Sequence, residues 1–192
     1  MTLNKYIVFA GVNGAGKTTF YQTNKEVQNM PRVNVDEIVR KFGRWDNPSD
    51  VIRAGREAVA LINAYFSEGI SFNQETTLCG KSILNNIEKA YRLGYSIDLY
   101  FVGLESVELA IKRVEMRVAA GGHGIPEKDI RRRFAESQRN LLKVMPLCSR
   151  VVVYDNTNVF RQIAVFSYGK CIDIDDNHPA WFDRLFESEL SK

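Results

Sequence analysis

The chain has 192 residues, of which 45% are hydrophobic and 26% are charged. This length and composition predict one globular domain with a sizeable core and exclude two ordinary domains. The formal net charge of +3 suits an anionic small ligand as well as nucleic acid, so charge does not choose between these partners. No apolar run is long enough for a membrane span or for a signal-peptide core with a cleavage site, which predicts a cytoplasmic protein without a membrane partner.

The three cysteines, Cys79, Cys148 and Cys171, are far apart, odd in number and without CxxC spacing. This pattern favours free thiols in a reducing compartment. We interpret Cys79, which lies near the predicted site, as a small buried filler residue.

Five short segments have the pattern of β-strands. The clearest is the continuous apolar run at 6–10, which is typical of a strand buried on both faces. The other four candidates are 32–36, 70–75, 97–102 and 151–154.

In the segments between these strands, apolar residues recur at helical spacing. The predicted helices run from Pro48 to Gly69, from Ile83 to Gly94, from Val107 to Gly121, and from Pro126 to Met145. Strands that alternate with helices indicate βαβ units, so we expect an α/β fold with a five-stranded, mostly parallel sheet flanked by helices.

The C-terminal region has a different pattern. The segments 162–167 and 170–174 flank the turn Tyr168-Gly169, which predicts an antiparallel β-hairpin at about 160–175. A last short helix is expected to open at Pro179, with Trp181 as a core residue rather than a ligand platform. We expect residues 1–192 to form a single domain.

The segment from Gly11 to Thr18 matches the phosphate-loop pattern GxxxxGK[ST], after a buried strand and before a helix. Glycines allow the backbone N–H groups and the helix N-terminus to face a phosphate group closely. Lys17 is expected to reach the β- and γ-phosphates, and Thr18 to offer its hydroxyl to Mg²⁺. The pattern therefore predicts a P-loop NTPase or kinase fold that uses ATP or GTP with Mg²⁺. The predicted nucleotide-binding residues are Gly11, Asn13, Gly14, Ala15, Gly16, Lys17, Thr18 and Thr19.

Other P-loop classes fit less well. The sequence lacks the NKxD motif of GTPases and the LSGGQ-type signature of transporter ATPases. It is also too short for a large motor core with an added lid. These absences favour a small P-loop kinase.

Two acidic residues, Asp36 and Glu75, follow predicted strands at the edge of the sheet where ligands of α/β proteins bind. A kinase needs a carboxylate to accept or orient the proton of the acceptor hydroxyl. The alternative for Asp36 is a helix N-cap, and the pattern alone leaves Glu75 undecided. Thr76 and Thr77 either bind the acceptor or cap a turn.

The segment at about 113–139 has the pattern of a lid. A helix with Arg113 and Arg117 runs into Gly121-Gly122, the expected hinge, and a second helix carries Arg131, Arg132 and Arg133. Helical spacing places Arg133 beside the buried stripe and Arg132 away from it. The alternative is that these arginines are solvated surface residues. His123 is expected in a loop where it can touch a ligand, and not as a metal ligand.

Several of these segments together resemble the zeta toxin family. The glycine-rich lid is similar to that of the short chromosomal members, and the likeness covers nearly the whole chain. The segments that carry the resemblance are 11–19, 34–38, 72–78, 94–95, 113–118, 121–126, 130–134 and 155–157.

The resemblance implies a P-loop kinase with Lys17 as the phosphate lysine, Asp36 as the catalytic base and Glu75 in the acceptor site. It also implies that Arg117 and Arg133 are lid arginines. The acceptor of the plasmid toxins is UDP-N-acetylglucosamine, phosphorylated on a sugar hydroxyl, and some plasmid toxins are inhibited by a small helical antitoxin. The lid differs from that of the plasmid toxins, which leaves the second lid arginine open within 131–133. The acceptor also stays open, because related kinases use different small molecules.

Three functions follow in order of support. The first is a kinase that phosphorylates a hydroxyl of a small molecule such as a nucleotide sugar. The second is a kinase acting on nucleic-acid ends, suggested only by a basic helix at 128–143 that lacks interleaved aromatic residues. The third is a non-catalytic nucleotide-binding module, against which the intact Lys17, Thr18 and Asp36 argue.

Overall fold

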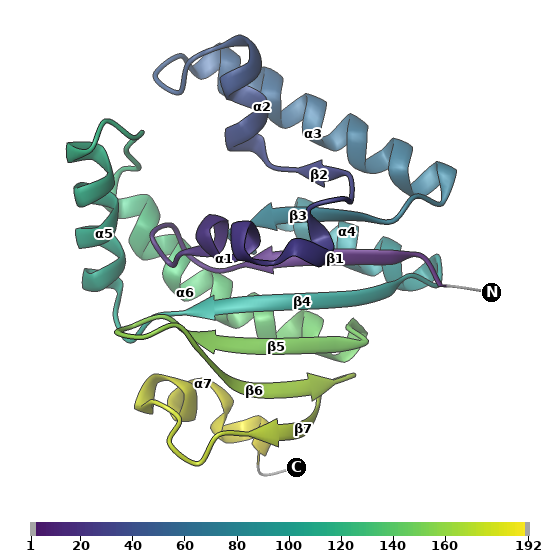
Figure 1. The fold of residues 1–192 in the computed structure, drawn as a ribbon, viewed down its shortest axis with the longest axis vertical. Helices are drawn as coiled ribbons and strands as arrows, with labels where there is room; N and C mark the ends of the chain where they lie inside the picture. The colour runs from purple at the N-terminus through teal and green to yellow at the C-terminus, as the bar shows by residue number, and fades with distance from the viewer. Residues whose placement is uncertain (1–2, 191–192) are drawn as a thin grey trace.

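A computed structural model describes residues 3–190. Its centre is a seven-stranded sheet in the order β2-β3-β1-β4-β5-β6-β7, with helices on both faces (Figure 1). The strands are β1 (Lys5–Ala10), β2 (Arg32–Val33), β3 (Phe72–Thr76), β4 (Ser96–Gly103), β5 (Arg150–Asp155), β6 (Arg161–Ser167) and β7 (Lys170–Ile174). The helices are α1 (Lys17–Thr23), α2 (Val35–Phe42), α3 (Pro48–Glu68), α4 (Lys81–Arg92), α5 (Val107–Ala119), α6 (Glu127–Val144) and α7 (Ala180–Leu190).

The end residues 1–2 and 191–192, which the predicted single domain includes, lie outside the described residues. Within 3–190, no helix combines the length and the apolar character needed to cross a membrane. Cys79, Cys148 and Cys171 are all free thiols, as predicted.

The apolar run of β1 is continuous because the strand is buried on both faces. Tyr6 and Val8 belong to a large core cluster with residues of α3, α4, α6 and α7, whereas Ile7 and Phe9 pack with Val27 and the aromatic residues of α1 on the other face. Alternating side chains of a strand point to opposite faces, so a strand between two helical layers has no polar face.

The five strands β1 to β5 are parallel, as the alternation of strands and helices predicts. β1 lies between β3 and β4, and its last residue, Ala10, is in register with Thr76 on one side and Phe101 on the other. The phosphate loop that follows Ala10 therefore emerges beside the end of β3. This is the point at which the strand order reverses, where ligands of open α/β sheets bind.

The predicted strand count of five was wrong, because the C-terminal hairpin joins the sheet. β6 pairs antiparallel with β5, and β7 with β6. The turn occurs at the predicted place, with Tyr168 and Gly169 both at positive φ (47° and 78°), as in the turns that suit tight hairpins. Without β6, β5 would be an edge strand with a row of unpaired backbone groups.

Trp181 is buried, as predicted, and it fixes the end of β5. Its Nε1 donates a hydrogen bond to Asp155 Oδ1 at 3.0 Å, and its ring occupies the space that a side chain on Gly103 would fill. Asp155 Oδ1 also accepts from the hydroxyl of Thr157 at 2.6 Å. These contacts hold the loop after β5 in place, next to the phosphate loop.

Candidate active site

The phosphate loop packs closely against α5 and against the loop after β5. Gly14 and Gly16 have positive φ (81° and 97°). A Cβ on Gly14 would lie 2.7 Å from the carbonyl oxygen of Ala110 in α5, and a Cβ on Gly16 would lie 2.4 Å from Asn156 Nδ2. Asn156 Nδ2 donates to the carbonyl oxygen of Ala15 at 2.8 Å. These positions require glycine both for the backbone conformation and for the close contacts.

Lys17 is the first residue of α1, and only 7% of it is exposed. Its Nζ donates to the carbonyl oxygen of Val12 at 3.0 Å, and burial lowers the pKa of the ammonium group. In the described part of the chain, no carboxylate lies within 4.0 Å of this nitrogen. A buried charge without an ionic partner is costly, so this ammonium group is available for a phosphate.

Thr18 and Glu75 face each other across the loop. Thr18 Oγ1 donates to Glu75 Oε1 at 2.8 Å, and the other oxygen of Glu75 accepts from Arg32 Nη2 at 2.6 Å and Asn34 Nδ2 at 3.1 Å. A hydroxyl and a carboxylate oxygen beside the phosphate loop are a donor set that Mg²⁺ prefers. These two side chains therefore fit the predicted metal, and Glu75 lines both cavities of the site.

Asp36 lies in a helix rather than at the end of a strand. The strand predicted over 32–36 ends at Val33, because the side chain of Asn34 accepts hydrogen bonds from the backbone N–H groups of Asp36 and Glu37 and so caps α2. The alternative that Asp36 is itself the cap was wrong. Asp36 occupies the first turn, with its side chain free to face the phosphate loop.

The side chain of Asp36 is 41% exposed, and its Oδ2 lies 3.6 Å from His123 Nε2. Burial raises the pKa of Asp36 above the usual aspartate value, and the charge of Glu75 adds to the rise. Positive charge on His123, Lys17 or Arg117 acts in the opposite direction. Burial lowers the pKa of His123, while the negative charge of Asp36 acts in the opposite direction.

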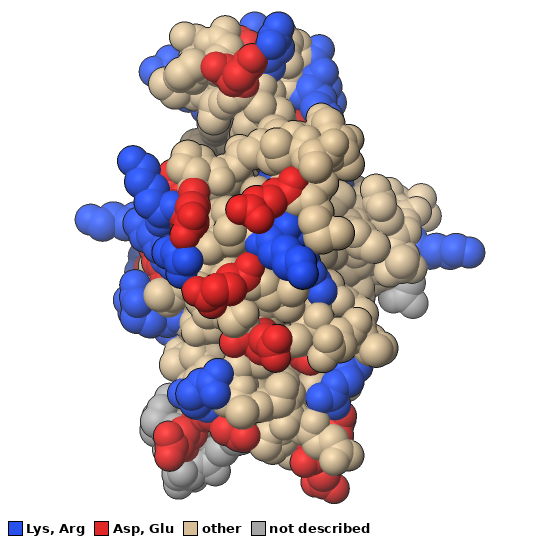
Figure 2. Space-filling view, turned by 90° about the vertical axis from the view of Figure 1, so that its left-hand side faces the viewer, with Lys and Arg blue, Asp and Glu red and all other residues tan. Residues whose placement is uncertain are grey.

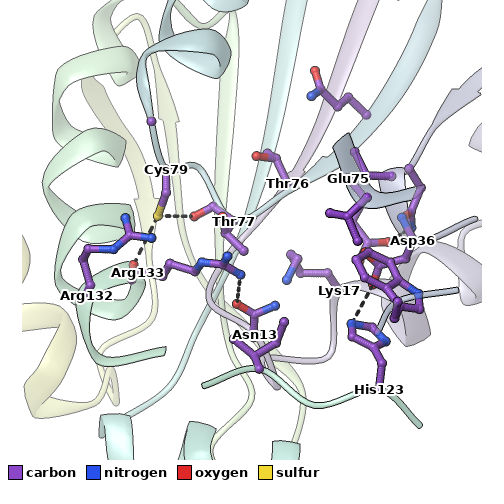
Figure 3. A pocket seen from close by; sticks show the side chains of 17 residues that line it. Asn13, Lys17, Asp36, Glu75, Thr76, Thr77, Cys79, His123, Arg132 and Arg133 are labelled. Carbon is purple, nitrogen blue, oxygen red and sulfur yellow. Dashed lines mark hydrogen bonds and ion pairs between the residues drawn. The ribbon is translucent and has the colours of Figure 1, made fainter. Parts of the chain in front are cut away.

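Two cavities meet at these residues. The smaller, which we call the phosphate cavity, has a volume of about 220 Å³ and is lined by the phosphate loop, Arg113 and Arg117. The larger, about 440 Å³, is lined by residues of β3, α2, α6 and the loops beside them, including the predicted Thr76 and Thr77. Both cavities are lined by Asn13, Lys17, Asp36 and Glu75. Lys17 points into this region between the Asn13–Arg133 pair and the Asp36–Glu75 side (Figure 3).

The arginines of α5 and of the first two turns of α6 fall into two groups. Arg131 forms ion pairs with Glu108 and Glu127, and Arg132 with Asp129 and Glu136. Arg113, Arg117 and Arg133 have no carboxylate within 4.0 Å among residues 3–190.

Within the run 131–133, Arg133 is the residue that reaches the phosphate loop. Its Nη1 donates to Asn13 Oδ1 at 3.0 Å (Figure 3), whereas both neighbouring arginines have their charge neutralised. Arg117 donates to the carbonyl oxygen of His123 at 2.8 Å and lines the phosphate cavity. Arg113 lines the same cavity, and its Nη2 donates to the carbonyl oxygen of Thr157 at 3.0 Å. The charges of these three arginines are therefore not neutralised by a described carboxylate and are available to a nucleotide.

The predicted hinge at Gly121-Gly122 is a helix cap. Gly121 has a φ of 86° and donates to Val118, while Gly122 donates to Arg117 at 2.8 Å. This pair of hydrogen bonds is the Schellman arrangement that ends a helix. The two glycines fix where α5 stops, and residues 123–126 form the loop before α6.

Four residues of the site were not singled out from the sequence. Arg32 and Asn34 hold Glu75, Asn156 holds the phosphate loop, and Trp45 lines the larger cavity. The Asn34 cap had a local signal in the acidic turn that follows it. Arg32 had none, since its role depends on a partner in β3.

Cys79, interpreted as buried, is half-buried and lines the larger cavity.

The face at which the parallel strands end carries both kinds of charge. Figure 2 shows basic and acidic side chains intermixed over this face rather than one continuous basic surface. A nucleic-acid backbone calls for a basic stripe or patch. This arrangement fits a small anionic ligand better than a long strand.

The sequence matches the model of the Zeta toxin family over residues 4–164. This chain belongs to the zeta toxin family. It is also 31% identical over 131 residues to an uncharacterized protein of Haemophilus influenzae (strain ATCC 51907 / DSM 11121 / KW20 / Rd), which covers 68% of this chain and 93% of that protein. The predicted α/β P-loop kinase fold and the family resemblance are both confirmed.

Two solved structures of the same fold have lower identity. A chain of the PezAT chromosomal toxin-antitoxin system of Streptococcus pneumoniae has a TM-score of 0.59 at 16% identity, covering 100% of this chain and 86% of that one. A chain of the Pnkp1/Rnl/Hen1 RNA repair complex has a TM-score of 0.59 at 22% identity, covering 74% of this chain. The present chain spans 47% of the length of that repair chain, which is about half of it.

Substitution of the unpaired arginines should affect catalysis more than substitution of the ion-paired ones. We expect Arg133→Ala and Arg117→Ala to lower kcat by roughly 100-fold or more, because charge placed at the transferring group stabilises the transition state. ATP affinity should change much less. Arg131→Ala is the matched control, since its charge is already paired, and Arg132→Ala should also be mild. Steady-state kinetics of the four variants would contradict this placement if Arg132 proved essential and Arg133 neutral.

Proposed function

We propose that this protein transfers the γ-phosphoryl group of ATP or GTP to a hydroxyl of a small molecule. Nucleotide sugars, with UDP-N-acetylglucosamine as the first candidate, are the proposed acceptors. The observation that carries the proposal is the meeting of two cavities at Lys17, Asp36 and Glu75. The phosphate cavity has the lining of a phosphate site. The larger cavity, which we call the acceptor cavity, has room, hydroxyls and a carboxylate for an acceptor.

The proposed reaction is a single displacement at phosphorus. The acceptor hydroxyl oxygen forms a bond to the γ-phosphorus as the bond from that phosphorus to the β–γ bridging oxygen breaks, and ADP or GDP leaves with that oxygen. The proton of the hydroxyl moves to the carboxylate of Asp36. Lys17, Arg117 and Arg133 offset the negative charge on the transferring group.

Thr18 and Glu75 would hold Mg²⁺, which supplies charge neutralisation on the phosphate oxygens when bound. Their side chains face the phosphate cavity, and Arg32 and Asn34 keep the carboxylate of Glu75 in place. This chain therefore contributes one hydroxyl and one carboxylate to the metal, and the nucleotide and water would complete the ligands.

The pH profile of kcat/KM should report the base. Asp36 must be ionised to accept a proton, and its pKa is raised by burial. We therefore expect activity to fall as the pH drops through a value above that of an ordinary aspartate. Measurement of kcat/KM between pH 4 and pH 8 checks this, and the fall should be absent from the residual activity of Asp36→Asn. A profile without an acid limb in this range would contradict the assignment.

A transfer screen tests the proposal directly. The protein is incubated with Mg²⁺ and γ-labelled ATP or GTP together with nucleotide sugars, simple sugars, nucleosides and a single-stranded oligonucleotide. We expect the label to appear on one small hydroxyl acceptor and not on the oligonucleotide. Label on the oligonucleotide ends would favour the nucleic-acid-end kinase, and nucleotide binding without transfer to any acceptor would favour a non-catalytic module.

Regulation by a protein partner is part of the proposal. The PezAT chain belongs to a chromosomal toxin-antitoxin system, and some plasmid toxins of the family are held inactive by a small helical antitoxin. We propose that this protein acts in the cytoplasm and that an antitoxin protein inhibits it. Co-purification with the product of a neighbouring gene would test the partner.

A further inference from the structure

His123 lies between the proposed base and an aromatic residue from another part of the chain. Its ring stacks on Trp45 with 4.2 Å between ring centroids and an interplanar angle of 10°. Its Nε2 is 3.6 Å from Asp36 Oδ2 (Figure 3). The side chain is 11% exposed, and both rings line the larger cavity. A loop residue packed in this way is held on two sides.

Trp45 is itself fixed by its turn. Asn47 N–H donates to the carbonyl oxygen of Arg44 at 3.2 Å, and Arg44 N–H donates to Asp50 Oδ2 at 2.9 Å. The Trp45 ring packs against the main core cluster. The turn after α2 thus offers a rigid surface on which the imidazole rests.

His123 also connects the two sides of the site. Its carbonyl oxygen accepts a hydrogen bond from Arg117, which lines the phosphate cavity, while its ring contacts Asp36 beside the acceptor cavity. Because the carboxylate of Asp36 is 41% exposed, it is free to rotate unless a neighbour restricts it. Among the described residues, His123 is the one basic side chain with a nitrogen within 4.0 Å of this carboxylate.

The closed arrangement leaves two buried donors unpaired. Trp45 Nε1 and Arg117 Nε are both buried and have no hydrogen-bond partner within residues 3–190. Unpaired buried donors are costly, and the cost disappears when a ligand or water reaches them. These two donors are therefore groups that a bound ligand or water would satisfy.

We propose that His123 is a positioning residue for Asp36: with the loop between α5 and α6 closed on Trp45, His123 holds the Asp36 carboxylate toward the acceptor cavity. This inference rests on the proposed kinase function and adds to it a requirement on the lid. Alignment of the base depends on a residue that also contacts a lid arginine, so acceptor activation is coupled to closure. Asp36 then does not activate water against the donor while the acceptor cavity is open, and closure excludes water.

Kinetics of paired variants test the role. We expect His123→Ala and Trp45→Ala to lower kcat by roughly 10- to 100-fold, the range for a misplaced catalytic group, with the KM for ATP within about threefold of wild type. Trp45→Phe keeps a ring for stacking and should recover most of kcat. His123→Phe keeps the stack but loses the nitrogen, so it should stay slow. His178→Ala is the control, because His178 pairs with Asp183, away from both cavities.

Tryptophan emission tests the contact without any acceptor. The chain has two tryptophans, and the emission of Trp45 is the difference between wild type and Trp45→Phe. An imidazole stacked on an indole quenches its emission, so His123→Ala should increase the Trp45 signal while His178→Ala leaves it unchanged. Near-identical thermal unfolding of His123→Ala and wild type would show that the fold is intact.

The outcomes separate this inference from the proposed function. Transfer by wild type, with kcat of His123→Ala and Trp45→Ala within threefold of it, overturns the positioning role alone. Unchanged Trp45 emission in His123→Ala also overturns it, whatever the activity. Increased emission together with no transfer by wild type to any acceptor overturns the proposed function, and the positioning role with it.

Discussion

Replacement of Lys17 by alanine should abolish phosphoryl transfer, with a loss of roughly 1,000-fold or more in kcat/KM. The Lys17 ammonium group is buried against the Val12 carbonyl oxygen at the junction of both cavities. Among residues 3–190, Lys17 is the only cation that lines both cavities, since each cavity-lining arginine lines one or the other. Its charge on the phosphates therefore has no equivalent substitute. Isothermal titration with ATP and steady-state kinetics measure the two effects separately, and binding should weaken as well.

The same variant should not be less stable than wild type. In the free protein, Lys17 is a buried charge without an ionic partner, and burial lowers the pKa of its ammonium group. Its removal relieves a desolvation cost, so thermal unfolding should occur at or above the wild-type temperature. Lys112→Ala, on the exposed face of α5, is the control for surface charge. Wild-type turnover in Lys17→Ala would refute the phosphate-loop assignment.

Asp36→Asn should lower kcat by a factor of roughly 100 or more while nucleotide affinity stays close to wild type, as expected for a lost general base. The amide has the shape of the carboxylate but cannot accept the acceptor's proton. The backbone N–H of Asp36 would still donate to Asn34, so α2 keeps its cap. Single-turnover transfer and ATP titration check the two halves of the prediction.

Glu37→Gln is a matched control for this variant. The side chains of Asp36 and Glu37 are neighbours on α2 and are each 41% exposed, but Glu37 forms an ion pair with Arg32 at 2.8 Å instead of facing the cavities. We expect a change of less than about fivefold, since the pair is partly exposed. Loss of ATP binding in Asp36→Asn would instead make Asp36 a metal or structural residue.

Much of the fold could be predicted because its signals are local. Burial of β1 on both faces produces its unbroken apolar run, and the hairpin turn needs two residues at positive φ, which Tyr168-Gly169 provides. The prediction failed at 32–36, where a single capping side chain, Asn34, ends the strand after two residues. It also failed for the strand count, since whether a hairpin extends a sheet depends on the free edge of β5 rather than on the hairpin.

The candidate site divides in the same way. The phosphate loop is contiguous, so its eight residues carry the spacing that a phosphate requires, and the sequence by itself predicted the roles of Lys17 and Thr18. Only the tertiary structure decided that Arg133, and not Arg132, reaches Asn13, that Arg32 holds Glu75, and that Trp45, His123 and Asp36 meet. Each of these contacts joins segments far apart in the chain. Its energy depends on distance in space and on the partners already present, and neither quantity is encoded in the spacing of residues along one segment.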